Sequence, residues 1–190
     1  MLDSDQPQRE HQNKVINAIP VMDLACSVDG SSYHGKASGS GGVFFKRDSA
    51  NELKTFSIKS EGDSQQAELT AVLHALTLLP SIERNTNTLH IFCDCKSAVR
   101  YIANKCRTPT AYTDTVLKIQ KEIRALRHEN IQIRIYWIPG HTGNEWNERA
   151  DALAKASAQL ALAAQRPTSD SSSVCVCGLS GAPCTNGPHN

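Results

Sequence analysis

The most informative stretch of this 190-residue sequence is Gly140-His-Thr-Gly-Asn-Glu-Trp-Asn-Glu-Arg-Ala-Asp151. Glycines on both sides of the His-Thr pair predict a turn, and Asp151 follows His141 by ten positions. Residues at helical spacing then predict a last helix with Asp151 near its start: Ala150, Leu153, Ala154, Ser157 and Leu160. We therefore expect a histidine-bearing loop followed at once by a helix that carries a carboxylate.

Upstream of this stretch, the hydrophobic pattern changes repeatedly between the strand and helix periods. Strands are predicted over 22–29, 43–45, 52–59, 89–93 and 131–137, and helical spacing covers 69–79, 97–104 and 112–126. A glycine-rich stretch, Ser38–Gly42, is interpreted as leading into the second strand. The resulting order βββαβααβα predicts an α/β fold with a five-stranded mixed sheet flanked by helices. The first and fourth strands are expected to be parallel neighbours joined by right-handed crossovers.

Composition sets the broad class of the protein. Hydrophobic residues make up 39% of the chain, which suffices for a core, and the formal net charge is only +1. No apolar run has the length of a membrane span, and the polar first 20 residues resemble neither a secretory signal nor a transit peptide. We expect a cytosolic or nuclear protein with one domain over 21–165, disordered segments over 1–20 and 166–190, and no evident obligate protein partner.

The seven cysteines are odd in number and irregularly spread. Free thiols are the favoured interpretation, since a reducing compartment does not sustain disulfides. A string of possible zinc ligands stands in the tail, at Cys175, Cys177, Cys184 and His189. A single residue between the first two cysteines fits the usual structural zinc spacing poorly, although the hypothesis stays open.

Four carboxylates occupy informative places in this predicted order. Asp29 is expected to end the first strand and Asp94 the fourth, while Glu68 and Asp151 stand near the starts of two helices. Neighbouring parallel strands place such residues side by side at the carboxyl edge of the sheet, where α/β folds bind ligands. Clustered like charges need neutralisation, and oxygen ligands suit Mg²⁺. A pair of metal ions held there would assist phosphoryl displacement.

Each carboxylate also has a simple structural interpretation when it is taken alone. Asp29 before a glycine is typical of a turn, and Glu68 near a helix start suits the helix dipole. Asp94 is placed to cap the following helix, and Asp151 is an ordinary acid on a helix face. Only the occurrence of all four in this order favours a shared site.

The motifs together resemble the type 1 ribonuclease H family, which includes stand-alone enzymes and the ribonuclease H domains of reverse transcriptases. Four stretches carry the resemblance, which spans about residues 21 to 160: Val28–Ser31, Gln65–Leu69, Cys93–Asp94 and Gly140–Asp151. The resemblance implies an endonuclease that hydrolyses the RNA strand of RNA–DNA hybrids, with two Mg²⁺ (or Mn²⁺) ions as cofactor. Its products would carry 5′-phosphate and 3′-hydroxyl ends.

The resemblance also implies roles for individual residues. Asp29 would bridge both ions, Asp151 would complete one site, and Glu68 and Asp94 the other. His141 matches a mobile histidine that assists catalysis or product departure, although a histidine between glycines is often a plain surface residue. The residues implied to bind substrate are Gly30, Ser31, Gln65 and Asn147. For Asn147, which shares a helical face with Asp151, holding the carboxylate in place and simple capping are further interpretations.

Two departures from the family bear on substrate binding. Lys96 stands where relatives often carry glutamine, and the segment after Asp94 is too short for the basic protrusion of some bacterial members. Residues 105–134 carry seven Lys or Arg against three Asp or Glu, so this stretch either contacts phosphates or is an ordinary solvated face.

Three alternative interpretations remain at this point. The chain would be a catalytically silent hybrid-binding module if its site were broken. It would belong to the DNA-cutting integrases, transposases and resolvases, which share the fold, although those lack the turn at His141. It could also be one unit of a retroelement polyprotein.

Overall fold

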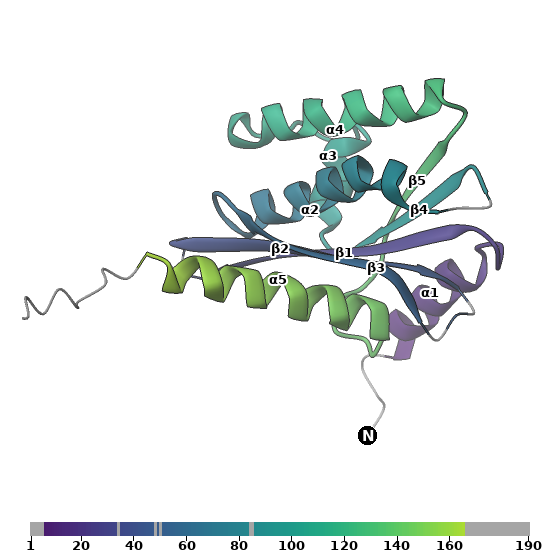
Figure 1. Cartoon of the computed structure of the whole chain (residues 1–190), viewed down its shortest axis with the longest axis horizontal. Helices are drawn as coiled ribbons and strands as arrows, with labels where there is room; N and C mark the ends of the chain where they lie inside the picture. The colour runs from purple at the N-terminus through teal and green to yellow at the C-terminus, as the bar shows by residue number, and fades with distance from the viewer. Residues whose placement is uncertain (1–5, 34, 48, 50, 84–85, 166–190) are drawn as a thin grey trace, which may run out of the picture.

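The computed structural model describes residues 6–33, 35–47, 49, 51–83 and 86–165, which form a mixed five-stranded sheet with helices on both faces (Figure 1). The elements in chain order are α1 (Gln6–Asn17), β1 (Leu24–Tyr33), β2 (Ala37–Lys46), β3 (Glu52–Ser60), α2 (Ser64–Leu78), a 3-10 turn (Leu79–Ser81), β4 (Thr88–Cys93), α3 (Lys96–Ile102), α4 (Thr110–His128), β5 (Gln132–Trp137) and α5 (Glu145–Ala163). From β1 onward, the predicted order of strands and helices is confirmed.

The sheet has the order β3-β2-β1-β4-β5, so β1 lies at its centre. Strand β1 runs antiparallel to β2 and parallel to β4, and the parallel pairing ends where Val28 faces Cys93. The first and fourth strands are therefore neighbours, as predicted. The prediction that Asp29 ends its strand was wrong, because β1 continues to Tyr33 against β2. Asp29 instead stands at the point where β4 stops beside β1.

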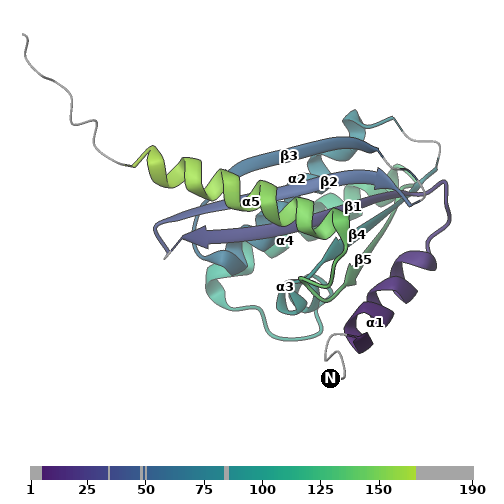
Figure 2. The same cartoon turned by 90° about the horizontal axis from the view of Figure 1, so that it is seen from below.

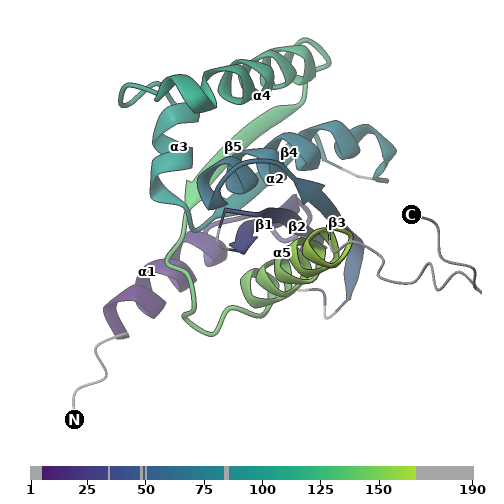
Figure 3. The same cartoon turned by 90° about the vertical axis from the view of Figure 1, so that its left-hand side faces the viewer.

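Helices cover both faces of the sheet (Figures 1 and 3), and two hydrophobic cores hold them there. On one face, α2 and α4 cover a core that includes Leu76, Ile91 and Ile119. On the other face, α5 covers a smaller core in which the Phe45 ring stacks on Trp146, with centroids 4.6 Å apart. Helix α1 lies on the same side as α5, near β5 (Figure 2). Helices α2 and α5 thus pack against opposite faces of the central strand β1.

The glycine-rich stretch lies inside β2, and its interpretation as a lead-in before the strand was wrong. A Cβ atom at Gly39 or Gly41 would lie 2.4 or 2.5 Å from backbone atoms of α5. Only glycine permits so close an approach of a helix to a strand. These glycines therefore set the position of α5, the helix that carries Asp151.

Helix α1 is the main departure from the prediction, which treated residues 1–20 as disordered. Val15 and Ile16 pack against the smaller core, and Ile19 beyond the helix is buried in it. Most other residues of α1 are polar and exposed. Its apolar stripe is too short to predict a helix from periodicity, and tertiary packing supplies the stability that the sequence pattern lacks.

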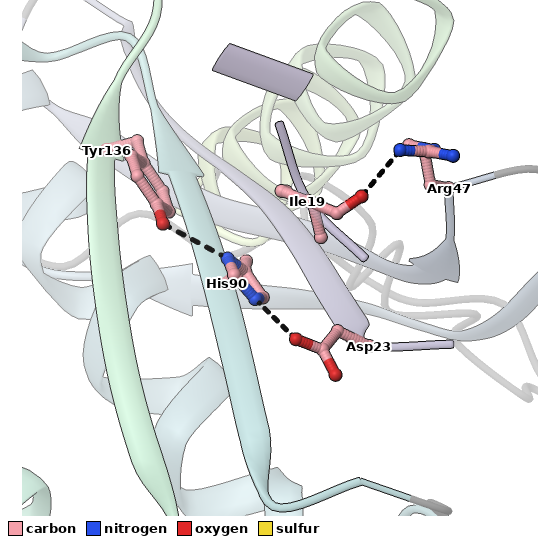
Figure 4. A network of polar contacts seen from close by, with 5 residues as sticks. All are labelled: Ile19, Asp23, Arg47, His90 and Tyr136. Atoms are coloured by element: carbon pink, nitrogen blue, oxygen red, sulfur yellow. Dashed lines mark hydrogen bonds and ion pairs between the residues drawn. The ribbon is translucent and has the colours of Figure 1, made fainter. Parts of the chain in front are cut away.

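Polar contacts fasten the segment after α1 to the sheet (Figure 4). Arg47 donates from Nη1 to the carbonyl oxygen of Ile19 at 2.6 Å. Close by, the buried ring of His90 lies between Asp23, whose Oδ2 is 3.0 Å from Nε2, and Tyr136, whose hydroxyl is 3.2 Å from Nδ1. These contacts join the start of β1 to β4 and β5, so the chain around α1 has a fixed path.

The carboxyl-terminal tail lies outside the described residues. Residues 166–190, with the hypothesis of a zinc site at Cys175, Cys177, Cys184 and His189, are not among them. Within the described ranges, Cys26, Cys93, Cys95 and Cys106 are free thiols. In the same part of the chain, no helix combines the length and the apolar character needed to span a bilayer.

Candidate functional site

Three carboxylates meet where β4 ends beside β1. Asp29 in β1, Glu68 in α2 and Asp94 directly after β4 each offer an oxygen, and these oxygens lie within 4.8 Å of one another. Asp29 and Glu68 expose only 6% and 7% of their surface. A buried group of acids needs neutralisation by protons or by cations. The structure therefore brings together three of the four carboxylates that the sequence singled out.

Close packing of α2 on β1 brings Glu68 to Asp29. A Cβ atom at Gly30 would lie 2.2 Å from the backbone nitrogen of Glu68, so glycine is required for this approach. The backbone of Gly30 also lowers the pKa values of both carboxylates, although burial outweighs this effect. The side chain of Asp63 caps α2 by accepting from the backbone nitrogen of Gln66 at 2.9 Å. The start of the helix, and with it Glu68, is thereby fixed.

Asp94 is held by the segments on both sides of the His141 loop. Trp137 donates from Nε1 to the Asp94 carbonyl oxygen at 2.9 Å, and Asn147 donates from Nδ2 to its Oδ2 at 3.3 Å. The backbone at Gly140 lies against the same carboxylate, since a Cβ there would be 2.5 Å from Oδ2. The end of β5 and the start of α5 thus orient Asp94.

Asn147, one of the predicted substrate-binding residues, is buried among hydrogen-bond partners at the start of α5. It exposes only 2% of its surface, and its side-chain oxygen accepts from the hydroxyl of Ser27 at 3.4 Å. Its backbone nitrogen donates to Asn144 at 2.9 Å, which caps α5. Asn147 is therefore a buried residue that orients Asp94, in line with the interpretation that it holds a carboxylate in place, and its role in substrate binding stays a prediction.

Asp151 lies beside the group of three rather than within it. Its charge and its side-chain contact both raise the pKa of Asp29, so it lies close to that carboxylate. It also forms an ion pair with Lys155 one turn later in α5, with Nζ 2.6 Å from Oδ2. Asp151 is half-buried. Of the four carboxylates, it is the one that already forms an ion pair with a lysine side chain.

Burial and mutual repulsion raise the pKa values of the three converging carboxylates. Burial, followed by the charges of Asp94 and Asp151, raises the pKa of Asp29 to about 8. Burial and the charge of Asp29 raise the pKa of Glu68 well above its ordinary value. Burial also raises the pKa of Asp94, which Asn147 and the nearby His141 partly counter. Such groups gain most from a cation placed among them.

His141 stands on the exposed loop between β5 and α5. Its φ angle is 55°, in the left-handed region that a non-glycine residue seldom adopts. The residue before it, Gly140, lies against the Asp94 carboxylate, so His141 is close to the acidic group. The loop therefore presents a strained, solvent-accessible histidine at the edge of the acidic group.

The remaining predicted substrate residues surround the same edge. Gly30 and Ser31 continue β1 past Asp29, and Gln65 lies in the first turn of α2. The amide of Gln65 donates to the Cys95 sulfur at 3.1 Å and accepts from the hydroxyl of Ser97. Sequence reasoning missed Cys95 and Ser97, because nothing in the local pattern shows that they face α2.

Lys96, the residue that departs from the family pattern, contacts an aromatic ring. Its Nζ lies 5.0 Å from the centroid of Trp137, the residue that bonds the Asp94 backbone. The sequence pattern predicted Trp137 only as the last residue of a strand. Its indole instead joins the lysine to the carboxylate-bearing turn.

Comparison with known sequences adds an independent finding. The profile of the family described as RNase H matches residues 23–159. The chain is 30% identical over 129 residues to the Pol polyprotein of an ovine maedi visna related virus, a match that covers 65% of this chain and 10% of that polyprotein. It is 26% identical over 144 residues to a ribonuclease H of Orientia tsutsugamushi, covering 74% of this chain and 83% of that protein. The chain thus spans about a tenth of the viral relative and most of the bacterial one.

Solved structures share the fold at low sequence identity. An amino-terminal RNase H domain from Mycobacterium tuberculosis superposes with a TM-score of 0.61 at 18% identity, covering 76% of this chain and 99% of that one. RNase H1 from Halobacterium salinarum gives 0.58 at 20% identity, covering 73% and 99%. A compost-derived RNase H1 in complex with an RNA/DNA hybrid gives 0.57 at 21% identity, covering 74% and 99%.

Proposed function

This chain belongs to the RNase H family, and from that premise we propose that it hydrolyses the RNA strand of RNA–DNA hybrids. The observation that carries the proposal is the convergence of Asp29, Glu68 and Asp94 within 4.8 Å, with Asp151 beside them. A structural neighbour in complex with an RNA/DNA hybrid supports the choice of substrate. The products are expected to carry 5′-phosphate and 3′-hydroxyl ends.

The donor set fits divalent cations. All its atoms are carboxylate oxygens, which hard ions such as Mg²⁺ prefer. Burial and mutual repulsion raise the pKa values of these carboxylates, and a bound cation would offset both effects. We propose that Asp29 contributes to the binding of two Mg²⁺ or Mn²⁺ ions, Asp151 to one, and Glu68 and Asp94 to the other. When bound, the ions would activate water and stabilise the attacking and leaving oxygens of the phosphodiester.

Protein residues orient these groups and approach the substrate. Asn147 fixes the rotamer of Asp94 through its amide. The exposed His141 is placed to accept or deliver a proton at the scissile phosphate or its leaving oxygen. Gly30, Ser31 and Gln65 line the edge from which a 2′-hydroxyl would be recognised, the feature that separates RNA from DNA.

The test is cleavage of a labelled RNA–DNA hybrid, with double-stranded and single-stranded RNA as parallel substrates, in Mg²⁺ and in chelator. We expect cutting of the RNA strand of the hybrid alone, and only with metal. Analysis of the product ends checks the position of bond breakage. Tight hybrid binding without any cleavage would contradict the proposal and identify a catalytically silent binding module.

A further inference from the structure

The amino-terminal helix α1 contacts the loop that carries His141. Gln12 of α1 is buried, with 2% of its surface exposed, and its Oε1 accepts from the hydroxyl of Thr142 at 2.5 Å. Thr142 is itself buried, and its hydroxyl also lies 3.2 Å from the carbonyl oxygen of Pro139. The residue next to the histidine is therefore tied both within its loop and to α1.

The backbone of this loop needs such an anchor. His141 has a φ of 55°, and Gly143 follows at 82°. A non-glycine residue keeps a left-handed conformation only when its surroundings hold it there. Thr142, the residue directly after His141, has a buried side chain whose hydroxyl is hydrogen-bonded. Its hydrogen bond to Gln12 thus stabilises the conformation that presents the histidine.

Helix α1 is itself held at more than one point. The ring of His11 lies 5.6 Å from that of Trp137, the residue that bonds the Asp94 backbone. At the other end, Arg47 donates to the carbonyl oxygen of Asn17 at 2.9 Å. The helix therefore forms a fixed support against which the loop is placed, rather than a loose appendage.

We propose that Gln12 is a positioning residue for the nuclease reaction, acting through Thr142 to hold His141 at the carboxylates. This inference rests on the proposed function. Gln12 lies outside the family match, which begins at residue 23. The contact is therefore contributed by an amino-terminal segment that the family match does not include.

The hydrogen bonding of Gln12 allows packing and positioning to be separated. Its buried Nε2 has no hydrogen-bond partner among the described residues, and an unpaired buried amide destabilises a fold. The substitution Gln12→Met keeps the length of the side chain and removes both the unpaired donor and the bond to Thr142. We expect it to leave the melting temperature equal or higher while it impairs the reaction.

Steady-state cleavage of a labelled hybrid in Mg²⁺ tests the positioning role of Gln12. Gln12→Met and Thr142→Val should each lower kcat about three- to tenfold, with KM changed less than about twofold, because a displaced catalytic group slows the chemical step. Thr142→Ser, which keeps the hydroxyl, should retain activity near that of the wild type. Asn13→Ala, at an exposed position of the same helix, serves as the matched control and should change nothing. Amide hydrogen exchange at residues 140–143 should accelerate in Gln12→Met.

A double-mutant cycle identifies the route of the effect. If Gln12 acts through His141, then Gln12→Met should cost nothing further in a His141→Ala background. A full additional loss in that background, or unchanged kcat for Gln12→Met alone, would overturn the inference while leaving hybrid cleavage intact. Wild-type kinetics of His141→Ala would overturn both the role of the histidine and the inference. Failure of the wild-type protein to cleave would instead contradict the proposed function itself.

Discussion

At Asp29, burial and charge oppose ionisation together. The carboxylate is enclosed by the sheet and α2, and Asp94 and Asp151 add like charge, which raises its pKa from 3.8 to about 8. A raised pKa means that the folded state binds a proton more tightly than the unfolded chain does. The associated stability is fully present below pH 3.8 and is lost as the pH rises through about 8. In chelator, the protein should therefore become less stable across this range.

The substitution Asp29→Asn tests this electrostatic cost directly. An amide carries no charge at any pH, so the variant should exceed the wild type in chelator at pH 8.5 by at least about 1 kcal/mol, or several degrees in Tm. The difference should shrink as the pH falls toward 3.8, where the unfolded chain also begins to bind a proton at this position. Thermal unfolding by circular dichroism measures both, and Asp114→Asn, at an exposed position of α4, is the control. A variant less stable than the wild type at pH 8.5 would show that the charge of Asp29 does not destabilise the fold.

The same substitution should separate cleavage from binding. Asp29 is the carboxylate proposed to contact both metal ions, so Asp29→Asn should reduce hybrid cleavage by at least about a thousandfold, on the scale of losing metal-assisted catalysis. Hybrid affinity, measured by fluorescence anisotropy, should change only a few-fold, because phosphate contacts dominate affinity. Comparable turnover by the variant would remove Asp29 from the mechanism.

Among the elements, those with a clear hydrophobic period could be predicted and those set by packing could not. Hydrophobic residues alternate along strand β5 and recur at helical spacing along helix α4, and both elements were predicted from the sequence. Helix α1 was missed because its apolar contacts come mainly from Val15, Ile16 and Ile19. The glycine-rich part of β2 was misinterpreted, since glycine suggests a turn locally and the helix that requires it lies over a hundred residues away.

The packing of α5 on β2 links stability to the active site. A Cβ atom at Gly41 would lie 2.5 Å from the carbonyl oxygen of Ala150, directly before Asp151. Gly41→Ala should therefore destabilise the protein by about 1–3 kcal/mol and displace Asp151, so that kcat falls in the fraction that remains folded. Chemical denaturation and cleavage of a labelled hybrid measure the two effects, with Thr55→Ala on the exposed face of β3 as control. A fully stable and active Gly41→Ala would show that α5 is free to shift away.

For the whole molecule, the rule that neighbouring parallel strands end at the same edge of the sheet predicted most of the site. Parallel neighbours β1 and β4 bring Asp29 and Asp94 together, and this was predictable from the order of strands and helices. The interactions of Thr142 with Gln12 and of Asp94 with Trp137 were not, because they join segments distant in sequence and no local pattern marks either partner. The sequence thus predicted the carboxylates of the site, but not Gln12, Thr142 or Trp137, whose contacts hold the His141 loop and Asp94.

Substrate affinity also depends on the whole molecule. The net charge of +1 gives no general attraction for nucleic acid, so local basic surfaces must supply the affinity. The basic stretch over 105–134 is the candidate phosphate contact, and Lys105 and Arg107 are exposed in the segment between α3 and α4. Removing both by alanine substitution should weaken hybrid binding and reduce the slope of log K against log salt by about 0.9 for each lost phosphate contact.

The matched control for this pair is Lys46→Ala/Lys54→Ala, which also removes two positive charges. Lys46 faces Leu24 at the start of β1, away from Asp29, so the control should leave the salt slope unchanged. Anisotropy titrations of the inactive Asp29→Asn protein over a series of salt concentrations provide the measurement without cleavage. Equal losses in both double variants would mean that only total charge matters. A change confined to Lys105 and Arg107 would place the hybrid across the end of α3, on the side of the sheet that α2 and α4 cover.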